Sequence, residues 1–362
     1  MILYENFKEI VLKDVPLIDV RAPIEFEKGA FPHTINLPIM NNEEREKVGI
    51  CYKQGGNEAA SKLGYELVSG SLKETRIKAW LEAIENNPQS LLYCFRGGQR
   101  SKIACQWIKE ASGLDLPRLE GGYKAFRNYL INELDESKQE SKPVLLGGYT
   151  GSGKTILLNK LEQAIDLEGI ANHRGSAFGQ KAIEQPSPIN FENRLAYDLI
   201  KHRNKGFKHL IIEDEGRNIG KRFLPQSIAN FFSSGSLVIL KRDLEERIDI
   251  IFEEYVLEAQ KEYSDIYGPE MGLNKWEDYI KASTMKLKKR WGLENCNRIL
   301  DLFDNAMRAQ ENKQDLTLHK EWIRFLLEDY YDPMYEFQIK NRLDTVIYEG
   351  GPLEVYEFLK DL

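Results

Sequence analysis

The sequence predicts an α/β protein of two domains, each with strands alternating with helices, followed by a helical C-terminal region. Three observations support this prediction. The chain has 362 residues, more than one hydrophobic core usually organises. Short apolar runs alternate with helical segments in the first third and again in the middle of the chain. The polar segment 133–143, which ends in proline, separates these regions and is typical of an interdomain linker.

Composition limits the class of protein. With 42% hydrophobic and 30% charged residues, the chain has the composition of an ordinary soluble globular protein. No apolar run is long enough to span a membrane, and the N-terminus lacks a basic region followed by an apolar stretch, so we expect a cytoplasmic protein with no membrane partner. The net charge of −7 argues against non-specific coating of nucleic acid, so RNA contact requires a local patch.

The first domain is expected to span residues 1–132 and to contain a parallel sheet. Its strands are predicted at 17–20, 34–38 and 90–93, and its helices at 72–85 and 101–110. The second domain is expected at 144–362. A strand at 144–146 precedes a helix that starts near Gly153, a further helix carries Phe191, Leu195 and Leu199, and strands follow at 209–213 and 236–240. The remainder is predicted to be mostly helical.

A cysteine loop lies where the third predicted strand of the first domain meets a helix. The loop consists of Cys94, Phe95, Arg96, Gly97, Gly98, Gln99 and Arg100. Backbone N–H groups, a helix N-terminus and arginine donors suit an anion, and the same field favours a nucleophilic thiolate. The alternative is a buried cysteine beside a glycine turn. Cys51, Cys105 and Cys296 lack such surroundings, and we expect them to pack or lie on the surface.

A phosphate-binding motif follows the polar segment. Its residues are Gly148, Gly151, Ser152, Gly153, Lys154 and Thr155, placed between an apolar strand and a helix as the Walker A pattern requires. The backbone of such a P-loop wraps a phosphate, the lysine reaches its oxygens, and the hydroxyl after it can ligate Mg²⁺. The sequence therefore predicts a P-loop NTPase-like domain, with the bound phosphate compound left open.

An acidic motif later in the same domain resembles Walker B. Glu213, Asp214 and Glu215 end an apolar strand, where a carboxylate can hold Mg²⁺ directly or through water. Thr155 and Asp214 are the candidate Mg²⁺ residues, and no tightly bound cofactor is predicted. A solvated acidic strand end is the alternative interpretation.

The N-terminal third resembles the rhodanese family. The resemblance lies in one segment, which runs from Asp19-Val-Arg21 through Glu25 and Gly29 to Ile35-Asn-Leu-Pro38. The Cys94 loop falls at the position of the active site in that fold. The loop has five residues between cysteine and arginine, one more than the usual sulfurtransferase loop and equal to that of the phosphatase relatives. The resemblance therefore implies a substrate with a phosphate-sized anion, such as selenophosphate, or a phosphatase.

The two modules together resemble the tRNA 2-selenouridine synthases over nearly the whole chain. The resemblance rests on the two loops and on further segments at 52–55, 119–127, 171–179, 191–195, 213–215 and 330–335. It implies a transferase that converts wobble 2-thiouridine to 2-selenouridine in tRNAs for lysine, glutamate and glutamine. The implied stages are S-geranylation from geranyl diphosphate and displacement by selenium from selenophosphate, with a selenophosphate-producing enzyme as a candidate partner.

Residue roles follow from that resemblance. Cys94 matches the essential cysteine and is expected to handle selenium, with a Cys-bound selenium intermediate as one route and with Arg96 and Arg100 holding the anion. Residues 148–155 are expected to cradle geranyl diphosphate. His173 and Arg174 are candidate contacts to a phosphate or the uridine, against the simpler interpretation of a structural histidine.

Two weaker signals and two alternatives stay open. The basic segment 281–290 beside Trp291 suits RNA phosphates, with the tryptophan available for stacking, or a solvated helical face. Tyr330, Tyr331 and Tyr335 suit base stacking or, more simply, a packing corner. The alternative functions are a rhodanese-type phosphatase or sulfurtransferase coupled to a kinase-like domain, and a non-catalytic, nucleotide-gated tRNA-binding protein.

Overall fold

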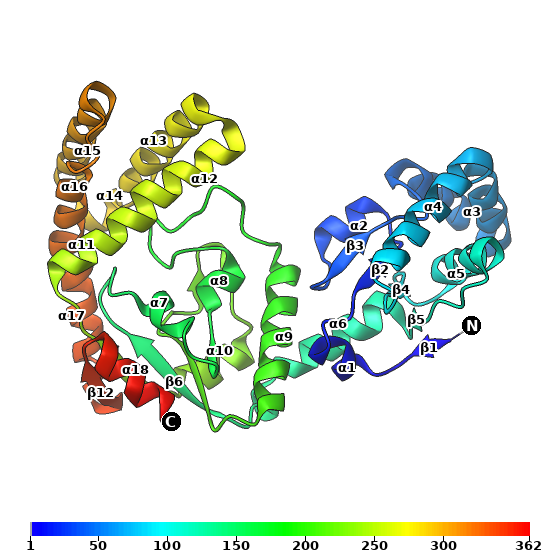
Figure 1. Ribbon diagram of the computed structural model, residues 1–362, viewed down its shortest axis with the longest axis horizontal. Coiled ribbons are helices and arrows are strands. Elements are labelled where there is room, and N and C mark those ends of the chain that lie inside the picture. Colours follow the sequence, from blue (N-terminus) through cyan, green and yellow to red (C-terminus); the bar gives the residue numbers. More distant parts are fainter. Residues whose placement is uncertain (1) are drawn as a thin grey trace. The chain divides into compact units, whose positions relative to one another are not determined.

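The computed structural model describes residues 2–362 and divides into two compact units. The first unit combines Met1–Lys138 with Ser187–Lys205, and the second combines Gln139–Pro186 with Gly206–Leu362. Figure 1 shows both units as sheets surrounded by helices. The predicted α/β class with a helical C-terminal part is confirmed.

The first unit is built on a five-stranded parallel sheet in the order β1-β5-β4-β2-β3. Its strands are β1 (Leu3–Tyr4), β2 (Leu17–Asp19), β3 (Thr34–Asn36), β4 (Leu91–Tyr93) and β5 (Arg118–Leu119). Its helices are α1 (Phe7–Leu12), α2 (Pro23–Lys28), α3 (Asn42–Leu67), α4 (Gly70–Asn86), α5 (Gln99–Ser112), α6 (Gly122–Glu133), the 3-10 turn η1 (Glu136–Lys138) and α9 (Pro188–Lys205).

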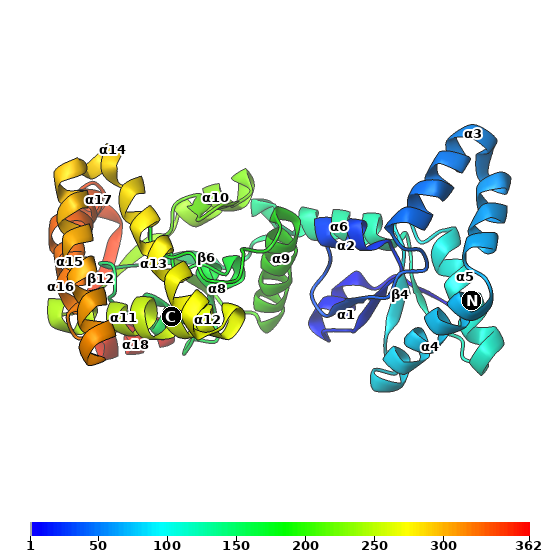
Figure 2. The same cartoon turned by 90° about the horizontal axis from the view of Figure 1, so that it is seen from above.

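Both faces of this sheet are covered. Figure 2 shows α4 and α5 on one side of β4 and α1 and α6 on the other. Trp80 of α4 and Trp107 of α5 belong to the core on the first side. On the second side Phe126 of α6 stacks on Phe7 of α1 and meets Tyr197 of α9. Burial on both faces explains why β2 and β4 are apolar runs rather than alternating segments.

The second unit holds a parallel sheet in the order β12-β11-β6-β8-β7. Its strands are β6 (Lys142–Gly147), β7 (Ala164–Ile165), β8 (His209–Glu213), β11 (Ser236–Leu240) and β12 (Val346–Gly350), and β9 (Asn218–Ile219) and β10 (Arg222–Phe223) form a separate antiparallel pair. The helices near the sheet are α7 (Lys154–Leu158), α8 (Leu167–Ala171), α10 (Gln226–Ser233) and α18 (Pro352–Lys360). Figure 2 shows α10 and α18 on opposite sides of the sheet.

A helical part completes the second unit and has a core of its own. It comprises α11 (Leu244–Phe252), the π-helical turn η2 (Glu253–Leu257), α12 (Glu258–Tyr267), α13 (Pro269–Lys286), α14 (Lys288–Trp291), α15 (Leu293–Lys313), α16 (His319–Leu326), the π-helical turn η3 (Leu327–Tyr331), α17 (Asp332–Lys340) and the 3-10 turn η4 (Leu343–Thr345). Trp276, Phe303 and Trp322 lie at its centre and are fully buried.

The division of the chain differs from the expected boundaries of 1–132 and 144–362, because α9 packs within the first unit. The side chain of Asn193 donates to the carbonyl oxygen of Ala30 at 2.7 Å, and Lys201 forms an ion pair with Asp14 at 2.6 Å. These partners lie far away in sequence, so helical periodicity alone could not locate them. The expected linker 133–143 is also partly ordered, since it includes η1 and the first residues of β6.

No helix within residues 2–362 combines the length and the apolar character needed to cross a membrane.

Candidate functional site

Cys94 lies at the carboxyl end of β4, directly before the loop that leads into α5. Its side chain is 3% exposed. The thiol lies 3.3 Å from the hydroxyl of Ser101, which itself donates to the carbonyl oxygen of Gly98. The structure therefore places the cysteine at a strand-to-helix turn, as the sequence predicted.

The backbone of this loop is fixed by the start of α6. The N–H of Tyr123 donates to the carbonyl oxygen of Cys94, and the N–H of Lys124 donates to that of Phe95, both at 2.9 Å. Gly122 has φ +59°, and a Cβ there would lie 2.3 Å from both the Cys94 oxygen and the Gly97 nitrogen. Only glycine allows this approach, which explains the Gly-Gly pair after β5.

Arg118 is a supporting residue that the sequence analysis did not single out. Its side chain lies on β5, is 4% exposed, and donates to the carbonyl oxygen of Gly97 at 2.6 Å and to the Ser101 hydroxyl at 3.2 Å. Its Nε has no hydrogen-bond partner within residues 2–362. A buried cation thus supports the loop beneath Cys94. Its only sequence signal was its place next to the phrase that starts at Leu119.

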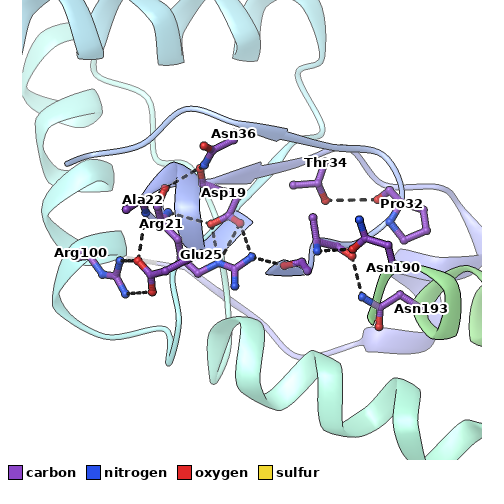
Figure 3. A network of polar contacts seen from close by, with 12 residues as sticks. Asp19, Arg21, Ala22, Glu25, Pro32, Thr34, Asn36, Arg100, Asn190 and Asn193 are labelled. Carbon is purple, nitrogen blue, oxygen red and sulfur yellow. Dashed lines mark hydrogen bonds and ion pairs between the residues drawn. The ribbon is translucent and has the colours of Figure 1, made fainter. Parts of the chain in front are cut away.

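The two predicted anion-binding arginines differ in their surroundings. Arg100 forms two hydrogen bonds with the carboxylate of Glu25 on α2, at 2.6 and 3.1 Å (Figure 3). Burial would raise the pKa of Glu25, but the hydrogen bond and charge of Arg100 outweigh it, and the pKa is lowered. Arg96 is exposed. Gln99 bonds the Ser61 hydroxyl. Arg96 is therefore the free cation of the loop, whereas Arg100 is already held by a carboxylate.

The Asp-Val-Arg motif has a structural part in the first unit. Asp19 and Arg21 are both buried, and Figure 3 shows their side chains joined. The Arg21 guanidinium donates to both carboxylate oxygens of Asp19 and to the carbonyl oxygen of Gly29 at 2.8 Å. It also lies 3.8 Å from the ring centroid of Tyr123. A buried ion pair needs this full set of partners. The motif links β2, α2 and α6, the elements that surround the Cys94 loop.

The other cysteines have the structural surroundings that the sequence predicted for them. Cys105 is buried, and burial raises its pKa to about 12. Cys296 is buried in the helical core, where its thiol donates to the carbonyl oxygen of Thr284. Cys51 is half-buried on α3. A thiol with a raised pKa is a poor nucleophile at neutral pH.

The P-loop connects β6 to α7 in the second unit. Gly148, Gly151 and Gly153 all have positive φ. The Lys154 ammonium donates to the carbonyl oxygen of Gly148 at 3.0 Å, across the mouth of the loop. Arg242 donates to the carbonyl oxygen of Ser152 at 2.9 Å and ties the loop to the end of β11. The structure thus assembles the predicted strand, loop and helix around Lys154.

Tyr335 of α17 covers the P-loop lysine. Its ring centroid is 5.5 Å from the Lys154 ammonium and 5.9 Å from the ring of Tyr149. Burial would lower the pKa of Lys154, but Tyr335, Glu168 and Glu215 outweigh it, and the pKa is raised. Lys154 is therefore a stable cation. Tyr335 thus contacts the site, whereas Tyr331 is 4% exposed and packs in the core, as favoured for the tyrosine cluster.

The acids after β8 are not equivalent. Glu213 is 1% exposed, and one of its oxygens accepts the N–H of Leu167 at 3.0 Å. Both oxygens of Asp214 accept from Arg342, at 2.7 and 2.9 Å. Asp214 is therefore paired with a cation in this structure, and the placement of Mg²⁺ by Asp214 and Thr155 stays a prediction. No group of three or more His, Cys, Asp or Glu side chains in the described chain is arranged to hold a metal ion.

Glu168, which the sequence analysis missed, contacts the P-loop instead. Its carboxylate accepts from the Thr155 hydroxyl at 3.3 Å, and its charge acts on Glu215. Burial first, and the charge of Glu168 second, raise the pKa of Glu215 to about 8. Burial also raises the pKa of Glu168. Burial therefore favours the protonated form of both carboxyl groups, next to Lys154.

His173 and Arg174 lie in a loop that packs on this carboxyl pair. Gly175 has φ +68°, and a Cβ there would lie 1.9 Å from an oxygen of Glu168. His173 accepts the N–H of Gly175, and burial lowers its pKa to about 4, so the imidazole is neutral at pH 7. Arg174 is paired with Glu262 at 2.7 Å. Both side chains therefore have structural partners beside the P-loop.

The fold and the two loops define an α/β protein with a P-loop in an AAA-type domain. The family model of the "tRNA 2-selenouridine synthase AAA domain" matches residues 141–362. Curated proteins named tRNA 2-selenouridine synthase are similar over nearly the full chain. The protein from Sulfurovum sp. is 49% identical over 98% of this chain and 97% of its own, and that from Shewanella frigidimarina is 45% identical over 98% and 96%.

A relative from Pseudomonas aeruginosa with the same name is 44% identical over 98% of this chain and 96% of its own. The chain belongs to the tRNA 2-selenouridine synthase family. A crystal structure of an N-terminal domain from Clostridium difficile 630 is 33% identical, with 36% of this chain and 98% of that chain covered and a TM-score of 0.33.

Proposed function

We propose that this protein converts 2-thiouridine at the tRNA wobble position to 2-selenouridine, as the names of its relatives indicate for them. The reaction has two stages, and each is assigned to one loop. The observation that supports the proposal is the presence of two separate strand-to-helix loops, one with a cysteine and one with a lysine, in a chain of this family.

The first stage is S-geranylation at the P-loop. The sulfur of 2-thiouridine attacks C1 of geranyl diphosphate, a C–S bond forms, and diphosphate leaves. Lys154 and the backbone N–H groups of residues 148–155 bind the diphosphate, whose charge they offset as it leaves. Its raised pKa keeps Lys154 charged. Tyr335 and Tyr149 flank the lysine, and their rings suit a partly apolar substrate.

The second stage is selenation in the rhodanese-like first unit. An S-alkyl group makes C2 of the base electrophilic. The selenium of selenophosphate attacks C2 and geranylthiol leaves, and water then cleaves the Se–P bond, which releases phosphate and leaves 2-selenouridine. Cys94 is the nucleophile assigned to the transfer of selenium, and the loop from Phe95 to Arg100 binds the phosphate group of selenophosphate. Arg96 supplies the free positive charge, while Arg118 and Gly122 fix the loop.

The cysteine assignment is tested with Cys94→Ser and the control Cys105→Ser. Cys105 is also buried in the first unit, but burial raises its pKa to about 12. We expect Cys94→Ser to accumulate geranylated tRNA without selenium, as seen by mass spectrometry of wobble nucleosides. The Cys105→Ser variant should still form the selenium nucleoside. Selenation at the normal rate by Cys94→Ser would contradict the assignment.

The P-loop assignment is tested with Lys154→Ala and the control Lys160→Ala, an exposed lysine beyond α7. We expect Lys154→Ala to lose geranylation and geranyl diphosphate binding, while it still selenates tRNA that is already geranylated. If Lys154→Ala geranylates at the normal rate, the P-loop binds another phosphate compound. Hydrolysis of simple phosphate esters by the Cys94 loop, without tRNA chemistry, would instead favour the phosphatase alternative.

A further inference from the structure

A group of five cations lies at one corner of the helical part of the second unit. We call it the basic corner, and it consists of Lys286, Lys288, Lys289, Arg290 and Arg298. All five side chains are exposed. None of them forms an ion pair within residues 2–362, and residues 279–293 contain no acid. In a chain with a net charge of −7, such a cluster is a local exception.

Apolar anchors hold the basic corner in place. Leu287 and Trp291, four residues apart, point inward from α14, and Leu287 is 4% exposed. Trp291 packs on Phe325 and on Tyr330, both at 5.3 Å, and donates to the carbonyl oxygen of Asp329. The tryptophan is therefore packed rather than free to stack on a base. The backbone that bears the neighbouring cations is consequently fixed by these packed side chains.

Other cations on nearby helices are neutralised locally. Lys281 pairs with Glu277 and Asp304, Lys320 with Asp249, and Arg324 with Glu245. Exposed pairs of this kind present little net field to a partner. Arg298 lies one helical turn from Glu294 and Asp301 and over the ring of Phe325. The other four cations of the basic corner have no acid in their own stretch of chain, so their charge is available to an external anion.

The basic corner is connected to the P-loop by one continuous segment. Trp291 contacts Tyr330, and five residues later Tyr335 covers Lys154. Five helical residues rise about 7.5 Å. Between them, Asp332 is held by Arg247 at 2.8 Å, which fixes the segment against α11. The basic corner and the P-loop are thus packed against the two ends of one short segment, and a polymer that presents several phosphates can bridge them.

We propose that the basic corner binds the phosphate backbone of tRNA and thereby presents the wobble base to the P-loop. This inference rests on the proposed function, because it takes the tRNA as substrate from it. RNA backbone suits the corner since the unpaired charges are clustered and exposed, and no aromatic side chain beside them is free for base readout. The contact is electrostatic and independent of sequence.

The test compares tRNA binding by two triple variants with the same change in net charge. The first carries Lys288→Gln, Lys289→Gln and Arg290→Gln in the basic corner. The control carries Lys281→Gln, Lys320→Gln and Arg324→Gln, all of which are paired with acids. Fluorescence anisotropy with a 2-thiouridine tRNA is recorded from about 50 to about 200 mM salt, because each phosphate contact contributes about 0.7–0.9 to the salt slope.

We expect the basic-corner variant to lose about 2–3 from that slope and to bind tRNA at least about tenfold more weakly near 150 mM salt. The control should keep the slope of the unmodified protein. Thermal melting and geranyl diphosphate binding should be unchanged in both, which separates lost RNA contact from lost fold. A photocrosslinker at Lys289 should capture tRNA.

Two outcomes overturn different statements. If the unmodified protein binds tRNA and the basic-corner variant binds with the same slope, the location is wrong while the proposed function stands. If the unmodified protein neither binds nor modifies the tRNA, the proposed function fails and this inference fails with it. An equal loss in both triple variants would indicate a general charge effect and would also overturn the location.

Discussion

The glycine beneath the Cys94 loop offers a sharp test of how the loop is held. Gly122→Ala introduces a Cβ 2.3 Å from the Cys94 oxygen and the Gly97 nitrogen, whereas ordinary contact starts at 3.4 Å. The loop must therefore move by about 1 Å, a displacement that can cost about 100-fold in rate. The left-handed backbone of alanine adds about 1–2 kcal/mol and the overpacking about 1–3 kcal/mol.

A matched control separates these two contributions. Gly113 has φ +76° at the end of α5 in the same unit, and a Cβ there meets no atom within 4 Å. We expect Gly113→Ala to lose only the conformational part and to keep selenation of geranylated tRNA. Gly122→Ala should lose about 100-fold in that rate, with geranylation intact. Equal selenation rates and equal stabilities for the two variants would refute the reasoning.

Three further predictions follow from buried groups. Glu215 has a pKa raised from 4.5 to about 8, so its contribution to the free energy of unfolding is greatest below pH 4.5. Up to about 5 kcal/mol of this contribution is lost as the pH rises through 8. Urea unfolding of metal-free protein should show this fall in stability, and Glu215→Gln should flatten it. His173 has a pKa lowered from 6.5 to about 4, so its contribution is lost in the opposite direction, as the pH falls below 6.5; His173→Gln should make unfolding less sensitive to acid. Arg118→Met should cost about 3 kcal/mol, since two charged hydrogen bonds disappear, and should slow selenation with no change in geranyl diphosphate binding; an unaltered selenation rate would show that the loop does not need this cation.

Local patterns predicted most of the elements that position the two loops. The apolar runs at 17–20, 90–93 and 236–240 form strands because both faces of each sheet are covered, and the Walker A spacing places Lys154 where expected. β12 was not predicted because its sequence, Val-Ile-Tyr-Glu-Gly, does not alternate between apolar and polar residues, and among the described residues it pairs with β11 alone at the sheet edge. The two-residue strands β1, β5 and β7 are too short to leave a pattern.

The partners within the sites were harder to predict because they come from distant segments. Glu168 reaches Thr155 and Glu215, and Arg342 occupies Asp214 from 128 residues away. Neither contact has a spacing rule, so the sequence did not indicate that Glu168 contacts the P-loop threonine or that Arg342 pairs with Asp214. The roles of Cys94, Arg96 and Arg100 stay predictions, although their placement on one loop agrees with the sequence.

The packing of α9 within the first unit has a consequence for how the chain folds during synthesis. The first unit lacks a structural element until residue 205 has been made, although its sheet is complete by residue 119. Until then Phe126 of α6 packs on Phe7 and Phe31 but lacks its contact with Tyr197. At about 5–20 residues per second, this wait lasts several seconds on the ribosome. The order of translation therefore makes completion of the first unit depend on emergence of part of the second, and a fragment ending at 138 would lack its own final helix.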